Sequence, residues 1–240
     1  MLEKIEGIVI DVRKHNDKTD IVTLFTRSRG RMAMLSPSAR GGKSGRGARL
    51  LPMSVVGASV NYHPDRELQR LGAVEPLQVW SSIYFNPVKS ALAVFLSEFL
   101  NHLLRASLAE PELWDYIVES TGSIDRMKGN ASNLHIAFLI SLLPYAGIEP
   151  RLDDYSDGDW FDMREGRFSS GRPLHNDVVE PGEARHILLL ARLTMANSRR
   201  LRLTQAERRR ALDMLLRYYA IHYQGLGSLR SLDVMHEIFS

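Results

Sequence analysis

The sequence predicts an α+β multidomain chain, with an N-terminal domain of short β-strands followed by an all-helical domain. Up to about residue 78, runs rich in Ile and Val are separated by Gly, Pro, Asn or Asp. Beyond this point the apolar residues recur at helical spacing instead. The chain has 240 residues, enough for one large domain or two small ones. We therefore predict domains at 1–78 and 79–240.

Five N-terminal segments have the composition and alternation of β-strands. Short strands in this number favour a small closed or sandwiched β-domain, and the oligonucleotide-binding (OB) barrel is the five-stranded candidate. Such a barrel binds its ligand on one face and on the adjoining loops. The segments are KIEGIVIDVRKH, DIVTLFTRSRG, RMAMLSPSA, MSVVGASVNYHP and ELQRLGAVEPLQ.

The helical domain has a clear first helix. Asn86 is suited to cap it and Pro87 to occupy its first position. The Leu and Phe residues of 92–104 then fall on one face. The stretch 151–181 loses this periodicity, and we predict an irregular insert there. Further helices are expected within 110–127, 130–147, 183–198, 204–224 and 228–239.

A basic segment lies within the β-domain, and no Asp or Glu occurs in residues 27–49. Arginine alternating with glycine and serine in SARGGKSGRGAR favours a cationic loop that follows an anionic surface. A solvated loop that only aids solubility is the alternative. We predict that these basic residues bind nucleic acid: Arg27, Arg29, Arg31, Arg40, Lys43, Arg46 and Arg49.

The same loop contains Gly42-Lys43-Ser44, the end of a phosphate-binding P-loop pattern. The first glycine of that pattern is replaced by Pro37, which lacks the N–H group that the turn needs. The segment that follows alternates like a strand, whereas a P-loop leads into a helix. These differences exclude the nucleotide-binding interpretation.

A second basic cluster occurs late in the chain, and Arg199, Arg200 and Arg202 form a candidate secondary patch. The arginines at 208–210 spread over more than half of a helix circumference, so some are expected to pair with Glu207 or Asp213. The tyrosines at 218, 219 and 223 could stack on bases, but their spacing is more typical of a core.

Catalytic, metal and cofactor sites are not indicated. The chain has no cysteine, its eight histidines are scattered, and no serine stands in a nucleophile motif. The carboxylates of 153–162 do not have the spacing of a calcium loop, and we expect a solvated acidic loop. We predict a protein that is not an enzyme and has no cofactor. The lack of a signal-like apolar run and of cysteine favours the cytoplasm, with no membrane partner.

Several segments together resemble the RecO family of bacterial recombination mediators, in the same order along the whole chain. The resemblance implies an OB barrel followed by a helical domain. It also implies binding and annealing of single- and double-stranded DNA, and action with RecR in loading RecA onto strands coated by single-strand-binding protein (SSB). The family contacts the acidic C-terminal tail of SSB, so an apolar pocket rimmed by cations is expected on the helical domain. The segments are GIVIDVRKHNDKTDIVTLFTRSRGRM, SARGGKSGRG, LLPMSVV, LLPYAGIEP and LRSLDVM.

The chain departs from the family at one point. Many members carry a four-cysteine zinc module, but Tyr155, Ser156 and Gly158 lie where its first thiol pair is expected. A zinc module is therefore not supported. The alternative to a DNA-repair mediator belongs to a different functional class, a protein-interaction adaptor. Its barrel would bind a protein or peptide, and its basic loop would only steer that partner.

Overall fold

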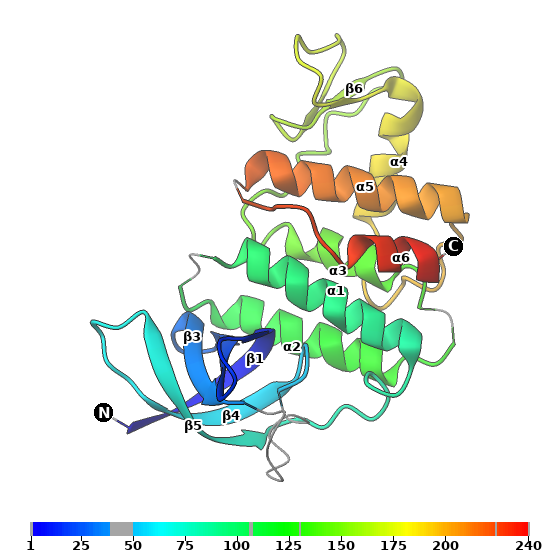
Figure 1. The fold of residues 1–240 in the computed structure, drawn as a ribbon. Coiled ribbons are helices and arrows are strands. Elements are labelled where there is room, and N and C mark those ends of the chain that lie inside the picture. The colour runs from blue at the N-terminus through cyan, green and yellow to red at the C-terminus, as the bar shows by residue number, and fades with distance from the viewer. Residues whose placement is uncertain (1, 39–49, 106–107, 130, 224, 240) are drawn as a thin grey trace. The chain divides into compact units, whose positions relative to one another are not determined.

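The structure is a computed structural model that describes residues 2–38, 50–105, 108–129, 131–223 and 225–239. The chain divides into two compact units, Met1–Lys128 with Ser228–Ile238 and Gly129–Gly227 with Phe239–Ser240. The first unit contains the barrel and helices α1, α2 and α6, and the second contains α3, α4, α5 and a small sheet (Figure 1). The division therefore lies after the second helix.

The first unit begins with a closed five-stranded barrel, which confirms the predicted fold class (Figure 1). The strands close in the order β1-β2-β3-β5-β4, as in an OB barrel. All neighbours are antiparallel except β3 and β5, which pair in parallel. The strands are β1 (Leu2–Lys14), β2 (Thr19–Thr26), β3 (Gly30–Pro37), β4 (Val55–Asn61) and β5 (Leu68–Pro76).

The barrel core follows from the alternation of the strands. Val9, Val22 and Leu24 point inward and are completely buried, as successive side chains point to opposite faces. The register of β1 against β2 shifts between Val9 and Asp11, and Asp11 pairs with Thr23. Because Thr23 lies between two inward residues, Asp11 belongs to the outer side of the barrel. This shift places the polar end of β1 outside the core.

Three helices complete the first unit: α1 (Pro87–Leu103), α2 (Pro111–Arg126) and α6 (Leu232–Ile238). The predicted cap of α1 is confirmed, because Asn86 Oδ1 accepts from the N–H groups of Val88 and Lys89 at 3.0 and 3.2 Å. The predicted Leu and Phe face of α1 is buried. At the start of α6, the Glu98 carboxylate accepts from the N–H groups of Arg230 and Ser231, both at 2.9 Å. These bonds attach α6 to α1, which lies beside it in Figure 1.

The connection between β5 and α1, residues 77–86, is fixed by Asp125 of α2. Its carboxylate accepts from the N–H groups of Ser82, Ser81 and Ile83 at 2.7, 2.9 and 3.0 Å. Burial raises the pKa of Asp125, but these hydrogen bonds outweigh burial and lower it to about 2. The connection is therefore an ordered part of the first unit.

The second unit contains α3 (Leu134–Leu142), α4 (Pro181–Ala191) and α5 (Gln205–His222). Tyr219 and Tyr218 of α5 are buried, and their hydroxyls donate to the carbonyls of Leu139 and Ile148 at 2.7 and 3.0 Å. Their predicted core role is confirmed. Within the described ranges, no helix is both long and apolar enough to cross a membrane.

Short strands occur in the stretch that was predicted to be irregular. They are β6 (Trp160–Asp162), β7 (Arg167–Ser169) and β8 (Val178–Val179), and they form a sheet in the order β7-β6-β8. Strands of two or three residues are too short to show an alternating pattern, so periodicity could not predict them. The described part of the second unit thus combines helices α3, α4 and α5 with a small sheet.

Candidate nucleic-acid interface

Four of the predicted nucleic-acid-binding residues, Arg40, Lys43, Arg46 and Arg49, lie outside the described residues. Their assignment stays a prediction. The other three, Arg27, Arg29 and Arg31, follow the end of β2 or lie at the start of β3. The structure gives these three side chains different environments.

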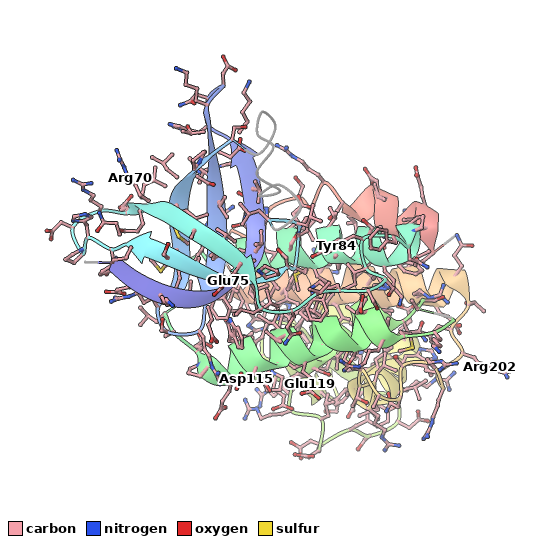
Figure 2. All side chains as sticks on the ribbon, turned by 90° about the horizontal axis from the view of Figure 1, so that it is seen from below. Arg70, Glu75, Tyr84, Asp115, Glu119 and Arg202 are labelled. Carbon is pink, nitrogen blue, oxygen red and sulfur yellow. The ribbon has the colours of Figure 1, made fainter. Side chains whose placement is uncertain are left out.

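Arg27 and Arg29 each have a carboxylate partner. Arg27 Nη2 lies 3.1 Å from Asp115 on α2, and its guanidinium lies 5.2 Å from the centre of the Trp114 ring. Figure 2 shows Asp115 on this helix. Arg29 donates from Nε and Nη2 to Glu3, both at 3.0 Å, and stacks 3.8 Å over the ring of Tyr62. Both arginines therefore tie elements of the first unit together and have part of their charge compensated.

Arg31 is different, because its main partner is neutral. Its Nη2 donates to Asn101 Oδ1 of α1 at 3.0 Å, and its buried Nε has no hydrogen-bond partner among the described residues. Burial lowers the pKa of Arg31, nearby Asp11 raises it, and the like charges of Arg13 and Arg105 lower it. The charges of Arg13 on β1 and of Arg105, which follows α1, therefore both affect Arg31 on β3.

We call Arg13, Arg31 and Arg105 the outer arginine cluster. Arg13 and Arg105 are exposed, whereas Arg31 and Asp11 are partly buried. Burial raises the pKa of Asp11, although Arg13 and Arg31 lower it. Glu98 also acts on Asp11, and its oxygens already accept hydrogen bonds at the start of α6. An anion such as a phosphate is the chemistry that this cluster fits.

The outer face of the barrel carries a further cation on β5, Arg70. Arg13 pairs with Ile21, Ile21 with Leu35, and Leu35 with Arg70 on β5. Residues paired in this way point to the same face, and Figure 2 shows Arg70 projecting from the barrel. Arg70 also lines a hollow of about 100 Å³ with His63 and Arg66, at the turn between β4 and β5.

Sequence reasoning missed Arg13, Arg70 and Arg105. Arg70 and Arg105 each lie outside any run of basic residues, and Arg13 begins only the short run Arg13-Lys14-His15. Strand register places Arg13 and Arg70 on the outer face of the barrel, and the packing of α1 on β1 brings Arg105 near Arg31. Only the outward position of Arg13, one strand period after Asp11, could have been inferred from alternation.

The secondary patch belongs to the second unit. Arg199, Arg200 and Arg202 are exposed, and Arg202 lines a groove of about 460 Å³ with Arg210 and Arg217. An apolar pocket of about 180 Å³ shares Met163, Leu190 and Met214 with this groove.

The arginines of α5 have separate partners, as predicted from their spread around the helix. Arg209 pairs with Asp213 at 4.0 Å, Arg210 with Glu183 at 3.7 Å and Arg217 with Asp177 at 2.9 Å. Arg208 is partly buried and donates to the carbonyls of Leu203 and Phe239 and to Asn133 Oδ1. These side chains do not form a single binding face.

The small sheet is held by aromatic packing where the family's zinc module is expected. Phe161 and Phe168 lie 5.3 Å apart between ring centres, and Tyr155 and Tyr218 pack at 4.8 and 6.2 Å on this pair. The chain has no cysteine, and no group of three or more His, Asp or Glu in the described part could hold a metal. The donor set therefore does not fit a four-cysteine zinc site.

The prediction of a solvated acidic loop is wrong for two of its residues. Asp159 and Asp162 are buried. Asp159 accepts from the N–H of Ser156 at 2.8 Å, and Asp162 lies 3.2 Å from the His175 ring. Both carboxylates organise the turns of the small sheet, so they do not form a solvent-facing cluster.

The closed barrel and its cationic outer face define a protein of the OB-barrel class, which binds oligonucleotides or oligosaccharides on the barrel. Family models described as "Recombination protein O N terminal" and "Recombination protein O C terminal" match residues 1–80 and 84–233. The chain belongs to the RecO family of DNA-repair proteins, which confirms the resemblance seen in the sequence.

Known relatives cover the chain from end to end. The "DNA repair protein RecO" of Bacteroides fragilis is 34% identical over 241 residues, covering 100% of both chains. The protein of the same name from Phocaeicola vulgatus is also 34% identical with the same coverage. The corresponding Porphyromonas gingivalis protein is 33% identical over 238 residues, covering 97% of each chain.

Proposed function

We propose that this protein is a non-enzymatic recombination mediator that binds single- and double-stranded DNA and anneals complementary strands. The outer arginine cluster is the observation that supports this function most directly. Its guanidiniums come from β1, from β3 and from the turn after α1, and that of Arg31 is partly buried with a neutral hydrogen-bond partner. Phosphate groups would supply the negative charge that the cluster lacks. Such contacts carry no sequence information, as a general mediator requires.

Annealing follows from the same electrostatics. Two complementary strands repel each other through their phosphates, and a cationic surface that binds both lowers this repulsion. Arg13, Arg31 and Arg70 lie on the outer face of the barrel strands and offer cations for such contacts. The predicted basic loop at 39–49 would add further cations to the same domain.

The proposal includes three protein partners. We propose that the protein acts with RecR in the cytoplasm and helps to load RecA onto SSB-coated strands. The apolar pocket beside Met214 and the adjoining groove with Arg202 are suited to the SSB tail, an acidic peptide with an apolar end. The pocket would bury the terminal apolar side chain, and exposed Arg202 would attract the acids.

DNA binding measured at several salt concentrations tests the proposal. We expect the protein to bind single- and double-stranded oligonucleotides of arbitrary sequence. The logarithm of the affinity should fall linearly with the logarithm of the salt concentration. The slope is about −0.7 per phosphate contact for single strands and about −0.9 for duplexes. An adaptor protein would bind a peptide partner yet show no such DNA binding. That outcome would contradict the recombination-mediator function and favour the protein-interaction adaptor.

A further inference from the structure

Phe85 is an unusual surface residue of the first unit. Its side chain is 83% exposed. The other Phe, Tyr and Trp side chains of this unit are buried or only partly exposed. Single exposed apolar residues are common on protein surfaces, so exposure alone does not assign a role. Whether Phe85 has a functional role therefore depends on the residues around it.

The backbone on both sides of Phe85 is held in place. Its own N–H donates to the Ser82 carbonyl at 3.1 Å, and the next residue, Asn86, caps α1. The Tyr84 hydroxyl donates to the Pro52 carbonyl at 3.1 Å, and Trp80 Nε1 donates to the Met53 carbonyl at 3.0 Å. Tyr84 is labelled in Figure 2. A ring on such a backbone can bind a flat partner with little loss of conformational entropy.

Cations lie close to this connection. Lys89 Nζ donates to Ser82 Oγ and to the carbonyls of Asp125 and Met127, each at 2.7 Å. These bonds bring the end of α2 beside residues 81–83, and the side chains of Arg126 and Lys128 there are exposed. An exposed aromatic ring, with exposed cations on the helix end that contacts the same connection, is the combination that binds unpaired nucleotides, through base stacking and phosphate contacts.

The size of the apolar surface favours a base over a protein. A stable protein interface buries roughly 800 Å² on each partner, whereas one aromatic side chain buries about 150–250 Å². A single ring is enough to stack on one base. Bases within a duplex are already stacked on their neighbours, so only a single strand can use this ring without disruption of base pairs.

We propose that Phe85 is a base-stacking residue that makes the protein discriminate single strands from duplexes. This inference rests on the proposed DNA binding and names the form of DNA that this position recognises. Stacking on aromatic residues is sequence-tolerant, because every base has a π face. The residue therefore adds strand selectivity without adding sequence specificity.

The test compares Phe85→Ala, Phe85→Trp and the wild type, with Val79→Ala as the matched control. Val79 lies in the same connection and is 81% exposed. Affinities for a 30-mer of deoxythymidine and for a 30-base-pair duplex are measured at two salt concentrations. Because stacking contributes about 1–3 kcal/mol per base, Phe85→Ala should weaken single-strand binding by roughly 5- to 150-fold. The salt slope, the duplex affinity and the melting temperature should stay unchanged.

The other variants separate the explanations. Phe85→Trp should keep single-strand affinity and show a change in tryptophan fluorescence when the strand binds, and Val79→Ala should bind like the wild type. Equal losses on both DNA forms, or no loss on either, would overturn the stacking role. A Phe85→Ala variant that loses only binding to RecR or to a second copy of the chain would show that the ring contacts protein. Absence of DNA binding in the wild type would refute the proposed function itself.

Discussion

Arg31 Nη2 donates to Asn101 Oδ1 across 3.0 Å and so connects barrel strand β3 to helix α1. Burial lowers the pKa of the Arg31 guanidinium, nearby Asp11 raises it, and the like charges of Arg13 and Arg105 lower it further. A protein that only needed to attach α1 to the barrel could use a neutral side chain at this position. Arg31 instead carries a positive charge at this position, near those of Arg13 and Arg105, and a phosphate-binding surface requires such charges.

Replacement of the exposed members of the outer arginine cluster should weaken DNA binding. We expect Arg13→Ala with Arg105→Ala to reduce the single-strand salt slope by about 1.4, since each lost phosphate contact removes about 0.7. The loss should be similar for all sequences. Arg209→Ala, an exposed arginine paired with Asp213 in the second unit, is the control and should bind normally. Fluorescence anisotropy at several salt concentrations measures both quantities.

The predicted basic loop can be tested in the same way. Alanine at Arg40, Lys43, Arg46 and Arg49 should weaken binding to every oligonucleotide and lower the single-strand slope by up to about 2.8. Urea unfolding should be nearly unchanged, because a glycine-rich basic loop is expected to bury little apolar surface. Wild-type DNA affinity in this variant would disprove the assignment of these four residues.

Asp125 should make stability depend on pH in the acid range. Its folded pKa of about 2 lies below the unfolded value of 3.8, so its contribution is present above pH 3.8 and is lost as pH falls through about 2. Asp125→Asn should lower the free energy of unfolding by about 2 kcal/mol at pH 7. The difference between wild type and variant, followed by urea unfolding, should shrink between about pH 4 and pH 2. A constant difference over this range would contradict the assigned hydrogen bonds.

The small sheet of the second unit should be stable without metal. A chelator should leave the melting temperature unchanged, and elemental analysis should find no stoichiometric zinc. Phe168→Ala should destabilise the unit by roughly 3–5 kcal/mol, the usual cost of removing a buried Phe side chain. Exposed Leu174→Ala is the control and should have little effect. One tightly bound zinc per chain would contradict the expectation that aromatic packing stabilises this sheet without a metal.

The apolar pocket of the second unit should bind the SSB tail peptide. Ala191 is exposed and lines this pocket, so Ala191→Phe should fill it and abolish binding without unfolding the protein. Arg202→Ala should reduce affinity by under about 1 kcal/mol, as expected for an exposed ion pair, and its effect should fade at high salt. Deletion of the terminal apolar residue of the peptide should cost more, about 1.5–3 kcal/mol. Calorimetry with the full chain distinguishes these outcomes.

Sequence patterns were sufficient where one rule governs a long segment. Strand β3 has one buried face, which imposes the alternation of residues such as Met32 and Met34, and the Asn86-Pro87 pair marks the start of α1. Patterns failed where structure depends on distant neighbours. Strands β6, β7 and β8 are too short for a period, and Asp162 is buried by turns that no local rule indicates. The outer arginine cluster joins residues that only strand register and helix packing bring together.

The attachment of α6 to Glu98 has a consequence for synthesis on the ribosome. The N–H groups that this carboxylate accepts belong to Arg230 and Ser231, near the C-terminal end of the sequence. Residues 129–227, between α2 and this closing segment, form the second unit. The nascent chain therefore presents the barrel and α1 long before their last helix has been translated. The second unit, continuous in sequence except for its final residues, can therefore fold before the first unit is complete, because the first unit still lacks α6.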